Sequence, residues 1–311
     1  MGEAAGQIGL DADRGRSPGS RAWARFRRNR PAIGSAVFLG LLMAAILAVL
    51  PMTFSRFDDQ VLALNRQPPT ASHWCGYDTL GRDLLVRCLF GGVISFSVGL
   101  GAAAISVTVG VLWGAIAALA GGRVDNAMMR LVDILYGLPY ILLVILMKVA
   151  FEQPLTAIIG DKQVANVVIL FVAIGSVSWL TMARVIRGQV LSLREMAFVE
   201  AARASGVGPG RILARHLLPN LVGPIVVYAT LTVPQAILQE SFLSFLGIGV
   251  APPVPTWGSL AAEGVAAINT IVSFWWILFY PCLFLGLTLL ALNFVGDGLR
   301  DAFDPKTVSR T

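Results

Sequence analysis

The sequence carries little charge for its length. Only 14% of its 311 residues are Asp, Glu, Lys or Arg, against about 25% in a typical soluble domain. Hydrophobic residues make up 56% of the chain, and the mean hydropathy is +0.73. Several uncharged runs reach about 20 residues, the length of helix that crosses a hydrocarbon core of about 30 Å. Because a helix satisfies its own backbone hydrogen bonds in lipid, the sequence predicts an all-α integral membrane protein.

Lysine is scarce, and its sequence context does not suit nucleotide binding. The three lysines, Lys148, Lys162 and Lys306, follow Met, Asp and Pro respectively. A phosphate-cradling G-x-x-x-x-G-K-[ST] loop needs glycine before its lysine. The chain therefore lacks that loop, and ATP bound in this way has to be bound by another chain. We assign no catalytic residue and expect the chain not to be an enzyme.

Cysteine and histidine are too few for a disulfide framework or a metal cluster. Cys75, Cys88 and Cys282 are scattered, and the last two stand in apolar runs. The two histidines, His73 and His216, are far apart in the sequence. We therefore expect no metal site on this chain.

The uncharged runs predict six transmembrane helices, which place both termini on one side of the membrane. If that side is the cytoplasm, eighteen Lys and Arg residues lie inside and six outside, as the positive-inside rule requires. We therefore expect the termini and the 194–220 loop to be cytoplasmic and the 56–87 and 246–270 loops to be extracytoplasmic. The six spans are expected at 31–55, 88–122, about 123–148, 163–183, 221–245 and within 272–295.

The segment 194–220 is the one long polar stretch between two apolar runs of spanning length. Its pattern predicts two short helices with a break. The first should end at Gly206, and Pro209 suits the first turn of the second, where its missing N–H costs nothing. Pro219 should then interrupt the second helix. A segment of this kind is either a rigid element that docks onto another protein or a surface loop that joins two spans.

The order Glu-Ala-Ala, Gly, Ile and Leu-Pro in this segment resembles the EAA loop of ABC importer membrane subunits. That resemblance implies a cytoplasmic loop whose short helix sits in a groove of a separate ATPase subunit. The residues to which it assigns ATPase coupling are Glu200, Ala201, Ala202, Gly206, Arg211 and Pro219.

Four further segments, at 76–83, 123–133, 240–258 and 293–305, resemble peptide and nickel permeases, and Tyr77 departs from their usual Thr. The set is most similar to the C-type membrane subunit of oligopeptide importers. It implies a type I importer fold in the bacterial inner membrane. It also implies a B-type permease partner, two ATP-binding subunits that hold ATP and Mg, and an extracytoplasmic peptide-binding protein. No cofactor is expected on this chain.

The implied organisation has four parts. A basic cytoplasmic tail at 1–30 precedes the first transmembrane helix and an extracytoplasmic segment at 31–86. The importer transmembrane domain, with five helices and the 194–220 loop, follows at 87–304, and a tail occupies 305–311.

Four charged residues outside the 194–220 loop are further candidates. Glu240 lies deep in the fifth apolar run, where an acid is a functional candidate by default. It would either line the pathway near the outer gate or cap the helix end. Asp78, Arg82 and Asp83 would either dock the binding protein or order the local structure. Arg130 and Asp133, three residues apart, are expected to pair.

Two alternatives stay open at this stage. Within the same fold, the substrate is an oligopeptide or else a dipeptide, a nickel chelate or a peptide-like antibiotic. The alternative of another class is a secondary transporter driven by an ion gradient, which would show inverted repeats and buried acids.

Overall fold

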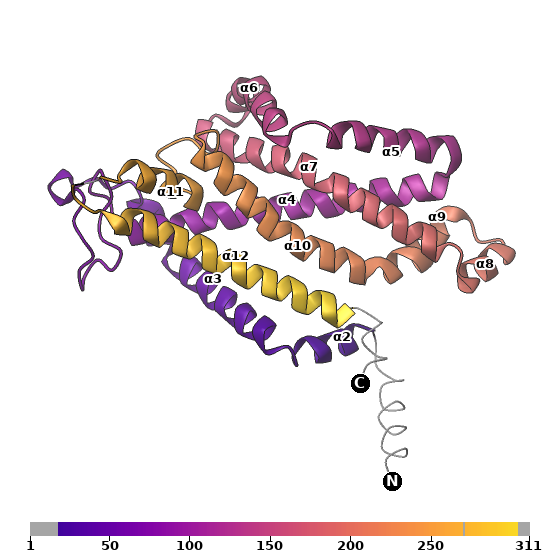
Figure 1. The fold of residues 1–311 in the computed structure, drawn as a ribbon. Coiled ribbons are helices and arrows are strands. Elements are labelled where there is room, and N and C mark those ends of the chain that lie inside the picture. The colour runs from indigo at the N-terminus through magenta and orange to yellow at the C-terminus, as the bar shows by residue number, and fades with distance from the viewer. Residues whose placement is uncertain (1–17, 270, 304–311) are drawn as a thin grey trace, which may run out of the picture.

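The computed structural model describes residues 18–269 and 271–303, and within them the chain is built from helices (Figure 1). Residues 1–17 of the predicted basic tail and the predicted tail at 305–311 lie outside the described residues. The elements in chain order are α2 (Pro18–Phe26), α3 (Arg30–Arg56), η1 (Leu62–Leu64), α4 (Leu84–Ala120), α5 (Gly122–Tyr136), α6 (Tyr140–Ile159), α7 (Lys162–Leu193), α8 (Ala197–Ala204), α9 (Pro209–Ile212), η2 (Leu213–Leu217), α10 (Leu218–Phe245), α11 (Trp257–Ala266) and α12 (Trp275–Phe303).

Six helical stretches are long and apolar enough to cross a membrane, which confirms the predicted number. The first of them, α3, begins after Asn29, whose side chain accepts a hydrogen bond from the backbone N–H of Ala32. The six stretches are α3, α4, α6, α7, the continuous run from Pro209 to Phe245, and α12.

The third span differs from the sequence prediction. Residues 123–148 were expected to form one helix, but the chain breaks at Gly137-Leu138-Pro139. Proline disfavours helical backbone in the residue before it and lacks the N–H that would continue the helix. The amphipathic helix α5 therefore ends at Tyr136, and the membrane-length helix is α6, which continues to Ile159.

Helix α4 lies at the centre of the bundle, between α7 and α10, with α3 and α12 on one side and α5 and α6 on the other (Figure 1). Its close contact with α7 depends on Gly110 and Gly114, which stand four residues apart in a G-x-x-x-G spacing. A Cβ atom at Gly110 would lie 2.6 Å from the Cβ of Met182. Side chains larger than hydrogen at these positions would push the two helices apart.

The two ends of the bundle carry different non-spanning structure (Figure 1). Helix α11 and the loop at 57–83 lie at one end, here called the α11 end, whereas α8 and α9 lie at the other, the α8 end. Helix α4 has 37 residues and is therefore about 55 Å long, longer than a hydrocarbon core. It connects the two ends directly.

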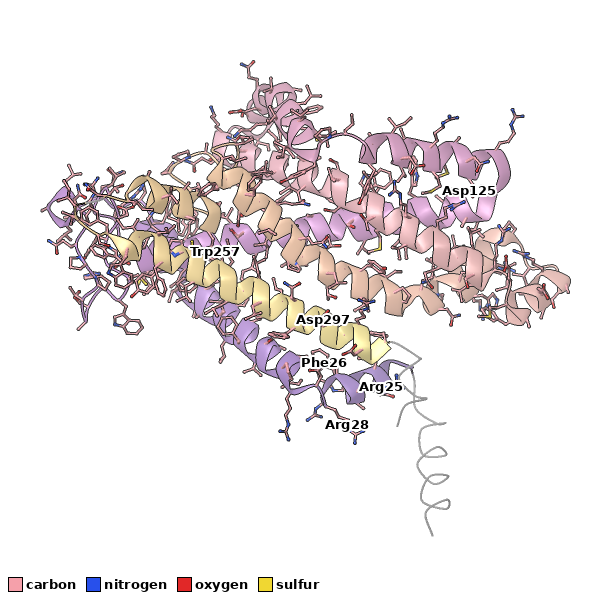
Figure 2. The ribbon with its side chains drawn as sticks, in the orientation of Figure 1. Arg25, Phe26, Arg28, Asp125, Trp257 and Asp297 are labelled. Carbon is pink, nitrogen blue, oxygen red and sulfur yellow. The ribbon has the colours of Figure 1, made fainter. Side chains whose placement is uncertain are left out.

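The described part of the basic segment packs against the last helix. In α2, Ala22 and Phe26 are buried against Ala32 of α3 and Ala302 of α12. Gly298 of α12 allows this approach, since a Cβ there would lie 3.2 Å from the Phe26 ring. Figure 2 shows Phe26 turned toward α12 and Arg28 turned away from the bundle.

Candidate functional site

The 194–220 loop folds as two short helices with a glycine break, as its sequence predicts. Helix α8 ends at Ala204, and Gly206 takes a left-handed conformation with φ of +75°. Its backbone N–H bonds the carbonyl of Arg203 at 2.9 Å. Glycine adopts this conformation without the steric cost that a Cβ brings. Pro209 then opens α9 at its first position, again as predicted.

Helix α8 touches the bundle through one side only. Val199 is fully buried in a cluster with Ile186 of α7 and Ile212 of α9, and Ala202 packs at its edge. The remaining surface of α8 faces outward and carries Met196 and Phe198 at 48% and 42% exposure. Five of the six residues predicted for ATPase coupling are exposed, and the sixth, Ala202, is half-buried. The five are Glu200, Ala201, Gly206, Arg211 and Pro219.

Pro219 was expected to interrupt the second helix, but the helical backbone continues through it. A π-helical turn at Leu213–Leu217 leads directly into α10, and Pro219 stands in the first turn of that helix. Proline cannot donate the hydrogen bond to the carbonyl four residues earlier. A π-turn absorbs such a local mismatch without ending the helix. The 194–220 loop is therefore rigidly continuous with the fifth span.

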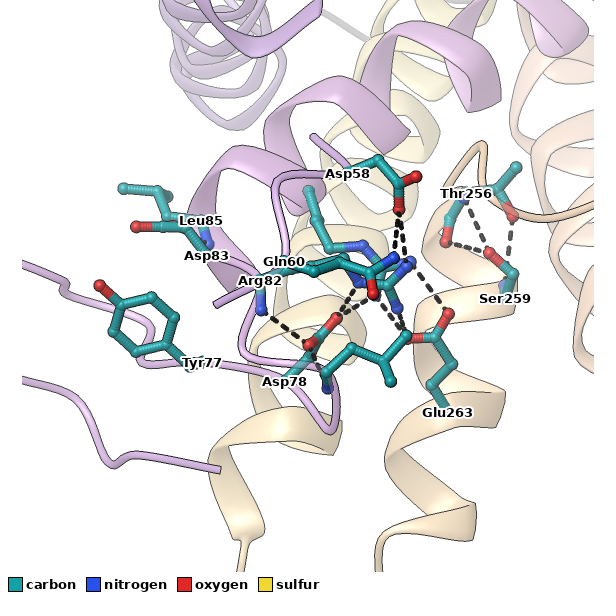
Figure 3. A network of polar contacts seen from close by, with 12 residues as sticks. Asp58, Gln60, Tyr77, Asp78, Arg82, Asp83, Leu85, Thr256, Ser259 and Glu263 are labelled. Carbon is teal, nitrogen blue, oxygen red and sulfur yellow. Dashed lines mark hydrogen bonds and ion pairs between the residues drawn. The ribbon is translucent and has the colours of Figure 1, made fainter. Parts of the chain in front are cut away.

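At the α11 end, Asp78 and Arg82 lie inside a buried ion-pair network (Figure 3). Asp78 is fully buried, and its Oδ2 accepts hydrogen bonds from Arg82 Nε at 2.7 Å and from Arg87 Nη1 at 2.6 Å. Arg82 Nη1 also donates to Asp58 Oδ1 at 3.1 Å. The network joins the loop at 57–83 to the start of α4.

Arg87 and Glu263 complete this network, and neither was predicted from the sequence as a candidate. Arg87 donates two hydrogen bonds to the Glu263 carboxylate, one of them from Nη2 to Oε1 at 2.9 Å. Glu263 comes from α11, so these bonds connect residues 176 positions apart in the chain. The only sequence signal was that Glu263 is the sole acid of the 246–270 loop.

Asp83 has a separate structural position as the N-cap of α4. Its Oδ1 accepts hydrogen bonds from the backbone N–H groups of Leu85 and Val86 at 2.9 and 3.1 Å. Its Oδ2 contacts His73 Nδ1 at 2.7 Å. Carboxylates at this position satisfy the free N–H groups of a first helical turn. All three residues predicted to dock a binding protein thus serve local structure here, and a docking role for them stays a prediction.

Cys75, in the same loop, is buried and chemically quiet. Its side chain is 4% exposed. Burial, together with the charge of Asp83, raises the pKa of the thiol to about 12. The group therefore stays protonated at neutral pH, and a protonated thiol is a poor nucleophile and a poor metal ligand. Among the described residues, no group of three His, Cys, Asp or Glu side chains could hold a metal ion.

Glu240 is fully buried in α10 and is bonded by hydroxyl groups. Ser95 of α4 and Ser244 of α10 donate to its two carboxylate oxygens at 2.9 and 2.7 Å. The backbone N–H of Trp257, the first residue of α11, in turn reaches Ser95 Oγ at 3.5 Å. Glu240 therefore ties α4, α10 and α11 together and touches no open surface of this chain. Its predicted role in a pathway or gate stays a prediction.

The α8 end holds its own ion pairs at the base of the loop. Asp125 accepts two hydrogen bonds from Arg187, each 2.6 Å long, and this bonding lowers the pKa of the carboxyl. Figure 2 shows Asp125 at this end and Trp257 toward the other. The expected pair of Arg130 and Asp133 is wrong, because Asp133 bonds Arg184 of α7 at 2.8 Å instead.

A hollow of about 370 Å³ opens between the α5–α6 break, α7 and α10. Charged side chains are absent from its lining, which is partly apolar and partly neutral and polar. Tyr136, Leu138 and Tyr140, which flank the break between α5 and α6, contribute to its lining. The sequence reading identified none of the residues that line it.

Comparisons with known proteins agree on one family. Residues 110–309 match the family described as binding-protein-dependent transport system inner membrane component. Residues 17–69 match the N-terminal transmembrane domain of oligopeptide transport permease C.

Individual relatives cover nearly the whole chain. It is 43% identical to the oligopeptide transport system permease protein OppC of Haemophilus influenzae, over 94% of this chain and 90% of that one. It is 44% identical to OppC of Escherichia coli, over 94% and 92%. It is 42% identical to the dipeptide transport system permease protein DppC of Bacillus subtilis, over 92% and 85%.

A solved structure shares the fold. An inward-facing conformation of the MetNI methionine ABC transporter aligns with a TM-score of 0.54 at 20% sequence identity. The alignment covers 71% of this chain and 97% of that one. At this identity the likeness concerns the fold alone, and it confirms the predicted importer permease architecture.

Proposed function

This chain belongs to the family of binding-protein-dependent transport system inner membrane components, and from that premise we propose that it imports oligopeptides. It is a multi-pass inner-membrane permease subunit of an ABC importer, which works with ATPase and substrate-binding subunits. The names of its relatives support a peptide substrate, since two are oligopeptide permeases and one is a dipeptide permease. Dipeptides are therefore the second candidate, ahead of nickel chelates and peptide-like antibiotics. Membership of this family opposes the ion-driven alternative.

The observation that carries the coupling role is the one-sided attachment of α8. The helix is held by Val199 and Ala202, while Glu200 and Arg203 are exposed and form no ion pair with any residue of 18–269 or 271–303. Exposed apolar groups, Met196 and Phe198, stand beside them. A surface of this mixed character suits a groove on another protein. The ATPase subunit occupies that groove in our proposal, and the π-turn transmits its movement to α10.

The rest of the complex follows from the same proposal. A B-type permease subunit forms the other half of the pathway, and an extracytoplasmic peptide-binding protein delivers the substrate. Two ATP-binding subunits hold ATP and Mg, and this chain itself is non-catalytic and binds no cofactor. Both termini and α8 face the cytoplasm, in line with the excess of basic residues on that side.

The experiment that tests this function is reconstitution of the full complex. The permease, its B-type partner and the ATPase subunits are purified together, and ATP hydrolysis is measured with and without peptide-loaded binding protein. We expect stimulation by the loaded binding protein that disappears in Glu200→Ala or Gly206→Asp. Failure of any ATPase to copurify, with peptide uptake driven by a proton or sodium gradient alone, would overturn the proposal.

A further inference from the structure

The hollow beside α10 is lined by neutral hydrogen-bonding side chains. On α10 they recur at spacings of four, three and four residues, which places them on one face of the helix. Across from them stand residues at the end of α5, at the start of α6 and on α7. The eight residues are Tyr136, Tyr140, Ser178, Thr181, Tyr228, Thr232, Gln235 and Gln239.

The opposite face of α10 shows that this polar stripe is not a packing surface within the chain. Val233 and Ile237 are buried against α4, where a Cβ on Gly99 would lie 2.7 Å from the Ile237 side chain. The polar stripe faces the hollow instead, and Gln235 is exposed there. Helix α10 therefore packs against the bundle through one face and presents polar side chains to the hollow through another.

The hydrogen-bonding capacity of the lining is largely unused. Gln239 lines the hollow, and its Oε1 exposes less than 1 Å² and has no hydrogen-bond partner among the described residues, so its terminal amide has to turn to bond an occupant. The side chains of Tyr140, Tyr228 and Gln235 likewise make no hydrogen bond within residues 18–269 and 271–303. Thr232 donates to the carbonyl of Tyr228 at 2.8 Å, which leaves its oxygen free to accept. Unpaired polar groups in such a place are unfavourable unless something binds them.

We propose that this hollow contacts the main chain of a peptide in transit. This inference rests on the proposed function and names the site at which this chain meets its substrate. Amide and hydroxyl groups both donate and accept, so they match the N–H and C=O groups that every peptide repeats. A lining without charge neither attracts nor repels charged side chains. The site therefore recognises the backbone and leaves side-chain selection to other parts of the complex.

The size of the hollow fits this occupant. Its volume of about 370 Å³ lies within the range of about 300–1,000 Å³ that small-molecule sites occupy. The competing occupant is the partner permease subunit, whose side chains would fill the space permanently. These two occupants make different predictions for a peptide that has lost a backbone donor.

The first test is a double-mutant cycle between chain and substrate in the reconstituted complex. The peptide is a tripeptide, used either unmodified or with its central amide N-methylated. Binding of each peptide to the binding protein is measured separately, and both are used at saturating concentration. In the wild type, we expect N-methylation to slow uptake about two- to tenfold, the factor for one lost hydrogen bond. In the double variant Gln235→Leu with Gln239→Leu, uptake is already slow, and N-methylation should have little further effect.

Gln163→Leu is the matched control, because Gln163 is half-buried at the start of α7 and lies outside the hollow. It should keep both the wild-type rate and the wild-type response to N-methylation. Equal N-methylation effects in the wild type and the double variant would overturn the inference while the proposed function stands. Absence of any peptide uptake by the wild-type complex would instead overturn the proposed function.

The second test does not depend on transport by a leucine variant. Gln235→Cys is made together with Cys282→Ser, since Cys282 is exposed and the other two cysteines are buried. We expect a water-soluble thiol reagent to label position 235 in the resting complex, and transported peptide to reduce the labelling rate severalfold. If the cysteine is unreactive in the assembled complex, with or without peptide, the partner subunit fills the hollow. That result would overturn the inference.

Discussion

At the α11 end, charged side chains are bonded to one another in the interior, whereas at the tip of the α8 end they stand in solvent. Asp78 is enclosed by Arg82 and Arg87 and has no exposed surface. Glu200 and Arg211 are exposed and form no ion pair with any described residue. The charged groups of the first region are therefore bonded within the chain, whereas Glu200 and Arg211 of the second are not.

In our proposal, this difference separates a structural region, the α11 end, from an interaction region, the tip of the α8 end. Breaking a buried ion pair leaves a charge without compensation, which costs far more than losing a surface charge. Substitutions at the α11 end should therefore cost more stability, whereas α8 has few buried contacts and, in our proposal, is held by the ATPase subunit. Local stability should fall in the same order, since segments with few buried apolar contacts open most easily.

Arg87→Met should have the largest effect. It removes the cation shared by Asp78 and Glu263 and leaves the buried Asp78 with Arg82 as its remaining ion-pair partner. Removing one member of a buried pair costs about 3–5 kcal/mol. Denaturant unfolding of the purified chain in detergent measures this loss. Arg56→Met, at an exposed position, should change stability by less than about 0.5 kcal/mol. Equal losses in the two variants would contradict the comparison.

Gly206→Asp should damage activity more than stability. Its φ of +75° costs a residue with a Cβ about 1–2 kcal/mol, so the chain between α8 and α9 would take another path. If that cost is lost from coupling, peptide-stimulated ATP hydrolysis should fall about five- to thirtyfold, since 1.4 kcal/mol corresponds to a factor of ten. The protein should still reach the membrane in normal amounts.

Gly210→Asp is the matched control for Gly206→Asp. Both glycines are exposed, and a Cβ at either position meets no atom within 4 Å, but only Gly206 has a positive φ. Gly210→Asp should keep most of the stimulated hydrolysis. If both variants are equally uncoupled, the new charge rather than the backbone geometry is responsible.

Glu240→Gln should have a smaller effect. Glutamine keeps the shape of the side chain and can still accept from Ser95 or Ser244, whose hydroxyl groups rotate. We expect peptide uptake within about twofold of wild type, because each hydroxyl retains a partner. Glu240→Leu, which leaves the serines unpaired, should instead lower thermal stability. Loss of uptake in Glu240→Gln, with stability unchanged, would favour the gate interpretation.

Asp125 should give the smallest effect, at the base of the α8 end. Hydrogen bonds from Arg187 lower the pKa of Asp125 below its ordinary value of 3.8. Its stabilising contribution is therefore complete above that pH and is lost as the pH falls through the lower folded-state pKa. The free energy of unfolding should decline more steeply below pH 3.8 in the wild type than in Asp125→Asn. Parallel pH profiles would show that the pair contributes nothing to folding.

Much of the architecture follows from local sequence. Six spans were predicted because a helix that crosses the lipid needs an apolar surface over a fixed length. Six are present. The break in the 194–220 loop was predicted because Gly206 and Pro209 restrict their own backbone. These effects act within a few residues, and a sequence displays them directly.

The third span shows where local reading fails. Its predicted end was about Lys148. In the structure α6 continues beyond it to Ile159, and Lys148 Nζ donates to the carbonyls of Ile248 and Gly249, both at 2.9 Å. Those carbonyls lie about 100 residues away in the chain, so nothing near Lys148 in the sequence announces them.

The sequence by itself determined the membrane class, the number of spans, the breaks in the 194–220 loop and the family resemblance, because hydropathy and backbone restriction are properties of neighbouring residues. Only the tertiary structure decided which charges are paired. In the fold, Arg87 pairs with Glu263, Asp133 pairs with Arg184 and not with Arg130, and Glu240 accepts hydrogen bonds from serine hydroxyls. The physical reason is that a charged group bonds to a partner that the fold brings within about 3 Å, however far apart the two residues are in the chain.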